Sequence, residues 1–318
     1  MEENKDYDLQ NGHKMDKTGL KEFGRNFICG IPIGVAFIIP GFSGGSVAAI
    51  LGIYEKMLCA ITAIFKDMKR SILTLMPIGI GLLLGAIALL FPLGWALDAF
   101  PIPTVSLFVG LAIGGIPSVT DKIKGKLSRS NIFALVIPGL LAIGLCFVPT
   151  GADVNLFNLD FFGYVILFMI GIIGACALVV PGISGSMLLL IFGYYNPIIK
   201  LMVDHFFKGK DFLDCIIILG TCGVGIGVGF LLISFIMKKL LDKYPRGTYF
   251  AILGFIVGSL PTVYISTMKD AKMLSSTMEL IWLPDSVMYW ICSVLLLAVG
   301  ISLSYGFIRY TAKIKKSE

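Results

Sequence analysis

Charge is the scarcest feature of this sequence. Only 14% of its 318 residues are Asp, Glu, Lys or Arg, whereas 57% are hydrophobic and the mean hydropathy is +0.90. A soluble domain usually carries roughly 25% charged residues. A water-soluble fold could not bury so much apolar surface, so the composition predicts an integral membrane protein. It excludes a cytosolic enzyme, a nucleic-acid-binding domain and a disordered chain.

Histidine is also scarce, with His13 and His205 as its two occurrences. A zinc or two-metal centre is therefore not expected. The seven cysteines lie in or beside apolar segments and form no C-x-x-C pair, so we interpret them as membrane-buried thiols. No charged start followed by a short apolar core and a cleavage site is present, so no signal peptide is expected. We predict no cofactor and no catalytic residue.

Long apolar segments are what the sequence has in excess. A full membrane crossing needs about 20 residues. Six segments are predicted to be full crossings: 72–91, 104–119, 131–149, 215–237, 249–266 and 287–308. Several of them contain Gly-x-x-x-Gly pairs, which predict close helix packing: Gly81/Gly85, Gly110/Gly114, Gly225/Gly229 and Gly254/Gly258.

Four further apolar segments form two pairs, 26–39 with 41–65 and 161–180 with 182–199. Each pair is joined only by an uncharged turn that begins with Pro-Gly. Proline removes a helical hydrogen-bond donor, and the residue before it avoids the helical region. We therefore predict two re-entrant hairpins, over 26–65 and 161–206, each of which enters and leaves the membrane on one side.

The distribution of basic residues supports this arrangement. With the N-terminus inside, the first hairpin returns inside, three crossings lead outside, and the second hairpin enters from outside. Three more crossings then return the C-terminus to the inside. Of the 26 Lys and Arg residues, 20 fall on the predicted inner side and five on the outer side. This bias is the positive-inside pattern of membrane proteins.

The two turns begin an internal repeat. Pro40-Gly41-x-Ser43-Gly44 matches Pro181-Gly182-x-Ser184-Gly185, and Gly52-Ile53-Tyr54 matches Gly193-Tyr194-Tyr195 at the same offset of 141 residues. We predict an all-α fold with polar tails at 1–23 and 313–318, a first repeat over 24–152 and a second over 153–312. Three crossings per repeat make the two halves inverted. Inverted repeats with broken helices are typical of transporters, whose substrate lies near the midplane.

The hairpin tips are the predicted binding site. A helix that starts at a tip points unpaired N–H groups, and roughly half a positive charge, into the membrane interior. Serine hydroxyls add donors, and glycine permits close approach. The candidate phosphate-binding residues are Ser43, Gly44, Gly45, Ser46, Ser184, Gly185 and Ser186. Alternatively, each motif only breaks a helix and its serine caps the next one. Its presence in both repeats favours an anion site.

Glu55 and Lys56 are the only charged pair within an apolar segment. Ionisable residues inside a membrane are costly and usually functional. Glu55 is a candidate proton carrier or organiser of the tip, and Lys56 a candidate counterion or substrate contact. The alternative is a mutual ion pair, or side chains that extend to the inner interface.

Five further residues are candidates for coupling or head-group contact. They occupy repeat landmarks or predicted inner membrane edges: Tyr54, Tyr195, Asn196, Arg25 and Arg246. Asn196 stands where the first repeat has Glu55. For the two arginines, the main alternative is anchoring at the inner membrane edge.

The residues around both turns resemble a known family. The resemblance rests on Gly34, Ala36, Ile38–Gly41, Ser43–Ser46, Leu51–Glu55, Pro181–Gly185 and Gly193–Tyr195. These residues are similar to the PopT-type polyprenyl-phosphate translocases of bacteria, and the resemblance covers about residues 24–310. It implies a flippase that returns undecaprenyl phosphate from the outer to the inner leaflet of the plasma membrane, for reuse in wall and surface-glycan synthesis. The chain departs from the family at Phe37, where a polar residue is common.

Two other classes of function stay open. A secondary carrier or channel for a small soluble anion would use the same tips with an aqueous vestibule. An intramembrane lipid phosphatase is disfavoured by the scarcity of histidine and the lack of a paired acidic motif. A purely structural scaffold is the least supported. The expected partners are the polyprenyl phosphate lipid and the membrane, with no nucleic acid. Coupling to a proton or to Na+, and assembly into a homo-oligomer, stay open.

Overall fold

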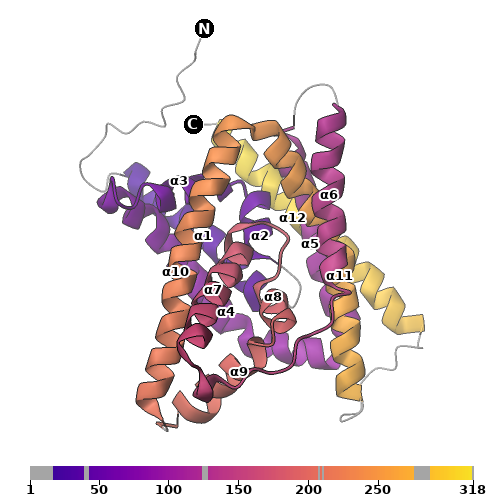
Figure 1. Ribbon diagram of the computed structural model, residues 1–318. Helices are drawn as coiled ribbons and strands as arrows, with labels where there is room; N and C mark the ends of the chain where they lie inside the picture. The colour runs from indigo at the N-terminus through magenta and orange to yellow at the C-terminus, as the bar shows by residue number, and fades with distance from the viewer. Residues whose placement is uncertain are drawn as a thin grey trace.

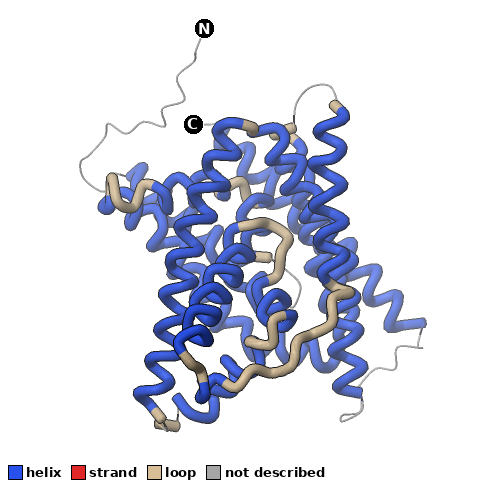
Figure 2. The backbone as a smooth tube through the Cα atoms, in the orientation of Figure 1, coloured by secondary structure: helices blue, strands red, loops and turns tan. Residues whose placement is uncertain are grey.

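The computed structural model describes residues 17–38, 43–123, 128–206, 208–209, 211–275 and 287–316. Within these ranges the chain is helical and contains no strand (Figure 2). The α-helices of the first half are α1 (Lys17–Ile38), α2 (Gly44–Ile50), α3 (Tyr54–Thr62), α4 (Met68–Ala99), α5 (Pro101–Thr120) and α6 (Arg129–Leu145). Those of the second half are α7 (Phe161–Val179), α8 (Gly185–Ile191), α9 (Tyr195–Lys200), α10 (Phe212–Lys243), α11 (Pro245–Ser275) and α12 (Val287–Lys316).

Six of these helices are long and apolar enough to cross a membrane: α4, α5, α7, α10, α11 and α12. This confirms the prediction of a multi-pass membrane protein. Five of the six coincide with predicted crossings. The sixth predicted crossing corresponds to α6, which has 17 residues and is shorter than a typical crossing. By length and composition α7 can also cross, although the sequence predicts it as one arm of a hairpin.

Glycine-mediated packing joins the first helix of each half to a long partner. α1 packs along α4, and α7 packs along α10 (Figure 1). A Cβ atom at Gly81 or Gly85 would collide with the backbone of α1, and one at Gly225 or Gly229 with the backbone of α7. The predicted packing role of these glycine pairs is therefore confirmed.

Each of the remaining long helices packs against a helix of the other half. α5 packs along α12, and α6 packs along α11. Gly110 and Gly114 of α5 lie against the backbone of α12, while Gly254 and Gly258 of α11 lie against the backbone of α6. The two halves therefore use glycines at equivalent positions of the repeat for equivalent contacts, and each half supplies helices to a shared bundle.

The returning arms of the hairpins differ from the sequence prediction. The sequence predicts one arm over 41–65 and one over 182–199, but the structure divides each into two short helices. α2 and α3 meet at an angle of 115°. The cause is a glycine with a left-handed backbone at each joint, Gly52 with φ of 70° and Gly193 with φ of 75°. Such a residue ends a helix, because its own N–H and the next one bond back to the last turn.

The two short joints lie at opposite ends of the molecule. In Figure 1, α3 lies toward the upper end of the view and α9 toward the lower end. A large buried apolar cluster surrounds α2 and includes residues from α1, α3, α4, α5, α10 and α11. A smaller cluster joins α7, α9 and α10 near the second joint. The short helices of the two halves are thus packed into different apolar clusters.

Candidate functional site

The two hairpin tips have the same local structure. α2 begins at Gly44 directly after Ser43, and α8 begins at Gly185 directly after Ser184. Both serines are extended, with φ and ψ of −114° and 126° for Ser43 and of −90° and 124° for Ser184. The predicted helix starts are confirmed. Residues 39–42, which include Pro40 and Gly41, lie outside the described residues, as do the side chains of Phe37 and Ser186.

The tip serines do not cap their helices. Ser43 and Ser184 occupy the N-cap positions, but neither side chain makes a capping hydrogen bond. Ser43 is 3% exposed and Ser46 is 2% exposed. The hydroxyl oxygens of both have no hydrogen-bond partner within the described part of the chain. Buried polar groups are usually hydrogen-bonded, and each exception requires an explanation. Capping of the following helix does not explain these unpartnered hydroxyls, because no capping bond is present.

The first tip lies directly against the second. A Cβ atom at Gly45 would come within 3.2 Å of the carbonyl oxygen of Val179 and 3.4 Å of the Cα atom of Pro181. The neighbouring atoms are backbone of the second break, so they cannot rotate away. A glycine is therefore what allows the two tips to meet at this distance.

Tyr54 links the two tips by a hydrogen bond. Its hydroxyl, on the first residue of α3, donates to the carbonyl oxygen of Val179 over 2.8 Å. The last four carbonyls of a helix have no partner within the helix, and Val179 is the last residue of α7. Because Tyr54 is 4% exposed, the bond is shielded from solvent. Tyr54 of the first repeat thus supplies the hydrogen-bond donor for a carbonyl group at the helix break of the second repeat.

Helices α5 and α11 support the tips from behind. Ser118 of α5 donates to the carbonyl oxygen of Ile50, the last residue of α2, over 2.5 Å. Gly182 follows Pro181 with φ of 85°, and a Cβ atom there would come within 2.6 Å of the backbone of Phe255 in α11. Each tip is therefore fixed to the corresponding long helix of its own repeat.

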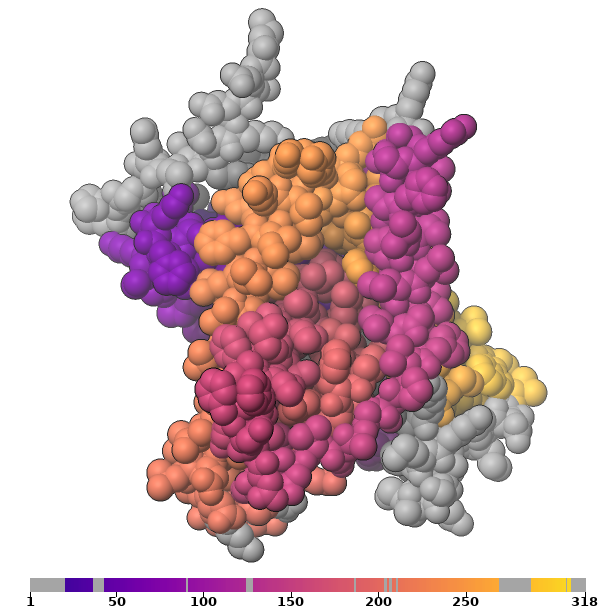
Figure 3. All heavy atoms as spheres, in the orientation of Figure 1, coloured from indigo at the N-terminus to yellow at the C-terminus, as the bar shows by residue number. Residues whose placement is uncertain are grey.

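The two tips differ in how deeply they are buried. All seven residues of α2 are buried, whereas six of the seven residues of α8 are half-buried and Ser186 is not described. Tyr54 is buried, but Tyr195 at the matching position is half-buried. In Figure 3 the salmon-coloured atoms of the second hairpin are visible at the surface between α7 and α6. The tip of the first hairpin is therefore more deeply buried than the tip of the second.

Glu55 contacts residues far away in the chain rather than Lys56. The hydroxyl of Tyr249, near the start of α11, donates to Oε1 of Glu55. The same carboxylate oxygen lies 3.5 Å from Nζ of Lys122, which follows the end of α5. Lys122 Nζ also lies 5.9 Å from the centre of the Tyr249 ring. The sequence analysis missed Tyr249 and Lys122. The available signal was the predicted topology, which places Lys122 in an inner loop and Tyr249 at the inner end of a crossing.

Lys56 is bound within its own hairpin. Its Nζ donates to Glu22 over 2.6 Å and to Asn26 over 2.9 Å, both on α1. The alternative of a mutual ion pair between Glu55 and Lys56 is therefore wrong. Lys56 therefore joins the start of α3 to α1.

At the second hairpin, the matching polar residues are exposed. Asn196 and Lys200 both donate to the carboxylate of Asp153, over 3.2 Å and 3.3 Å. All three belong to the second half of the chain. Asn196 therefore does not join the two halves as Glu55 does.

The two candidate arginines differ in exposure. Arg25 is exposed on α1, one turn before Cys29. Arg246 is half-buried as the second residue of α11, three residues before Tyr249, so it lies near the Glu55 contacts. Within the described ranges, no group of three or more His, Cys, Asp or Glu side chains could hold a metal ion.

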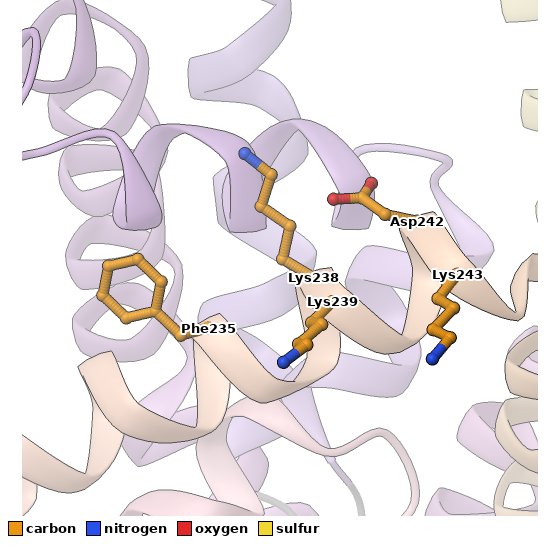
Figure 4. Close-up of a pocket in the computed structure, with 5 residues that line it drawn as sticks. All are labelled: Phe235, Lys238, Lys239, Asp242 and Lys243. Atoms are coloured by element: carbon orange, nitrogen blue, oxygen red, sulfur yellow. The ribbon is translucent and has the colours of Figure 1, made fainter.

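Two hollows lie near this part of the fold. One, of about 550 Å³, is at the end of α10 and is lined by Phe235, Lys238, Lys239, Asp242 and Lys243. Figure 4 shows Lys238 and Asp242 pointing to one side of α10 and Lys239 and Lys243 to the other, so these charges do not converge on one point. The second, of about 370 Å³, borders Gly44, Gly45, Tyr54 and Val179 and is otherwise lined by apolar side chains. It adjoins the tips directly.

Comparison with known proteins gives one family. The model of the VCA0040-like family, described as undecaprenyl phosphate translocase-like, matches residues 33–281. A polyprenyl-phosphate transporter of Vibrio cholerae serotype O1 is 26% identical, over 90% of this chain and 96% of its own length. A polyprenyl-phosphate transporter of Staphylococcus aureus is 29% identical, over 91% of this chain and 97% of its own length. No solved structure gives a significant match.

Proposed function

The chain belongs to the undecaprenyl phosphate translocase-like family, and from this premise we propose that it moves a polyprenyl phosphate across the bacterial plasma membrane. The family consists of transporters rather than enzymes, and its members are multi-pass membrane proteins. The resemblance of the sequence to polyprenyl-phosphate translocases agrees with this assignment. We further propose the direction from the outer to the inner leaflet, which returns undecaprenyl phosphate for reuse.

The phosphate head group is proposed to bind where the two tips meet. The buried hydroxyls of Ser43 and Ser46, without partners in the described structure, are the observation that carries this proposal. A phosphate oxygen would accept hydrogen bonds from them, and from unpaired N–H groups at the starts of α2 and α8. The contact of Gly45 with the backbone of Val179 and Pro181 supports this location, because it brings the start of α2 against the second break.

The two repeats are proposed to be inverted in the membrane. The glycine contacts, the N-cap serines and the left-handed Gly52 and Gly193 recur at equivalent positions of both halves. Toward the upper end of Figure 1 lies α3, and toward its lower end lies α9. Together with the 20-to-5 distribution of basic residues, this supports hairpins that enter from opposite sides, with both termini inside.

The difference between the tips supports alternating access. In the first hairpin, α2 is fully buried, and Glu55 holds the following helix α3 to Tyr249 and Lys122. The second hairpin is half-exposed, and its Asn196 bonds only within its own half. We propose that this conformation is closed toward the inner side. Release of the phosphate inward then requires the Glu55 contacts to break as the two repeats move against each other.

Glu55 is also the proposed coupling residue. Moving one negative charge inward against an inside-negative potential costs about 2.3 kcal/mol per 100 mV. A cation that moves with the lipid offsets this cost. Protonation of Glu55 would neutralise the carboxylate that pairs with Lys122, so it would loosen the contact between the two halves. A proton is therefore the coupling ion that these contacts favour over Na+.

The function is tested by reconstitution. Purified protein in liposomes should move fluorescent undecaprenyl phosphate from the outer to the inner leaflet, measured by loss of accessibility to an external quencher. Ser43→Ala should slow this movement. A carrier for a small soluble anion would instead move inorganic phosphate, and lipid phosphate would not compete. Transport of the soluble anion alone would contradict the proposed function.

A further inference from the structure

The apolar hollow of about 370 Å³ beside the first tip has no role in binding the phosphate head. Its walls come from both halves of the chain: α1, α2, α3 and α4 on one side, and α7 and α10 on the other. Ile33, Leu82, Met57, Leu58 and Phe230 supply most of the side-chain surface. An apolar cavity holds neither water nor ions favourably, because it offers them no hydrogen-bond partners. Its occupant is therefore apolar.

The position of the hollow relative to the tip restricts that occupant further. Gly44, Gly45 and Ala48 form its wall on α2. The buried hydroxyls of Ser43 and Ser46 lie on the same short stretch of chain. A ligand whose charged end binds at the start of α2 would therefore have this apolar surface next to the same helix start.

We propose that this hollow binds the isoprene units directly next to the phosphate of the transported lipid. The proposal rests on the proposed function and deepens it, because it names a tail subsite within the transporter. In a polyprenyl phosphate the hydrocarbon begins at the first carbon after the phosphate oxygen. A phospholipid carries polar glycerol ester groups at that point, and these would be buried here without partners. The hollow thus selects a prenyl phosphate, while the rest of the tail lies in the lipid.

Filling the hollow tests the proposal. Leu82 of α4 lines it and is half-buried, whereas the adjacent Leu83 is 59% exposed and faces away. In nanodiscs, Leu82→Trp should weaken binding of radiolabelled undecaprenyl phosphate, with Leu83→Trp as the matched control. Excluding two methylene-sized groups from an apolar cavity costs about tenfold in affinity. We expect a loss of about that size for Leu82→Trp and none for Leu83→Trp.

A second pair of variants tests the proposal independently, in case Leu82→Trp misfolds. Met57 of α3 also lines the hollow, and Cys59 on the same helix is exposed. Met57→Trp should weaken binding as Leu82→Trp does, and Cys59→Trp should not. Each variant is first checked by its elution as a single peak in gel filtration. If Leu82→Trp does not fold, the Met57 and Cys59 pair decides the question.

Direct labelling gives an independent readout. A prenyl phosphate with a diazirine on its first isoprene unit should label peptides that contain Met57 or Phe230. If the wild type binds the lipid and all four variants bind it equally, the tail subsite is wrong and the proposed function stands. If the wild type does not bind undecaprenyl phosphate, the proposed function and the tail subsite both fail. Labelling confined to lipid-facing residues such as Leu83 would also overturn the subsite.

Discussion

The hydroxyl of Tyr54 donates to the carbonyl oxygen of Val179 over 2.8 Å, although the two residues are 125 positions apart in the chain. Tyr54 begins α3 in the first repeat, and Val179 ends α7 in the second. The bond therefore joins the two breaks on which the proposed binding site depends. Tyr54 also lines the apolar hollow, so the same side chain borders both the proposed head-group site and the proposed tail subsite.

Removing the Tyr54 hydroxyl should separate the tips. Tyr54→Phe leaves the buried carbonyl of Val179 without its donor, which costs about 1–3 kcal/mol. We expect a lower thermal unfolding temperature in detergent and slower lipid movement in liposomes. Tyr244→Phe is the control, because Tyr244 is 56% exposed. Equal behaviour of the two variants would show that the bond does not hold the tips together.

The contact at Gly45 should be sensitive to a single methyl group. Gly45→Ala places a Cβ atom 3.2 Å from the carbonyl oxygen of Val179 and moves the tips apart. Alanine also favours the helix by roughly 0.5–1 kcal/mol, so thermal stability should change little while transport falls. Gly144→Ala is the control, because a Cβ atom there meets open space. Unchanged transport by Gly45→Ala would mean that the close approach of the tips is not required.

Replacing the tip serines should lower transport without lowering thermal stability. Ser43→Ala and Ser46→Ala each remove a buried hydroxyl that has no partner in the described structure, so unfolding temperature should stay equal or rise. Transport and affinity for undecaprenyl phosphate should fall. Ser234→Ala removes an equally buried hydroxyl on α10, which is part of neither tip, and should leave transport unchanged. Full transport by the double variant of Ser43 and Ser46 would remove the main support for the head-group site.

The contacts of Glu55 should control the response to a pH gradient. Glu55→Gln abolishes protonation at this site, so inward movement of the lipid should lose its dependence on the gradient. Tyr249→Phe removes the donor to Glu55 and should loosen the closed inner side without removing the titrating group. Its transport should therefore still respond to the gradient. The control is Glu22→Gln, an exposed carboxylate paired with Lys56. A gradient dependence that survives in Glu55→Gln would eliminate Glu55 as the coupling residue.

The local features of the fold were predictable because short-range chemistry determines them. Pro-Gly followed by serine predicts a break and a new helix start, and the structure has those starts at Gly44 and Gly185. Gly-x-x-x-Gly spacing predicts close packing, which Gly81 and Gly225 confirm. The division of the returning arms depends on one left-handed glycine in each. This effect was hidden by the continuous apolar pattern around Gly52 and Gly193.

The long-range contacts were not predictable from the sequence. Whether the tips touch depends on how α7 and α2 pack, and no local pattern encodes the distance from Gly45 to Val179. The partners of Glu55 come from α11 and from the segment after α5, so they are set by tertiary structure. The apolar hollow is likewise formed by helices from both halves of the chain, α1 to α4 together with α7 and α10.

A structure of the protein with undecaprenyl phosphate bound, in a lipid nanodisc, tests the central claim most directly. The account predicts phosphate density within about 3 Å of the Ser43 or Ser46 hydroxyl and of the backbone N–H groups that begin α8. It also predicts the first isoprene units in the hollow between Leu82 and Phe230. Phosphate density at the lysines that end α10, with empty tips, would contradict it.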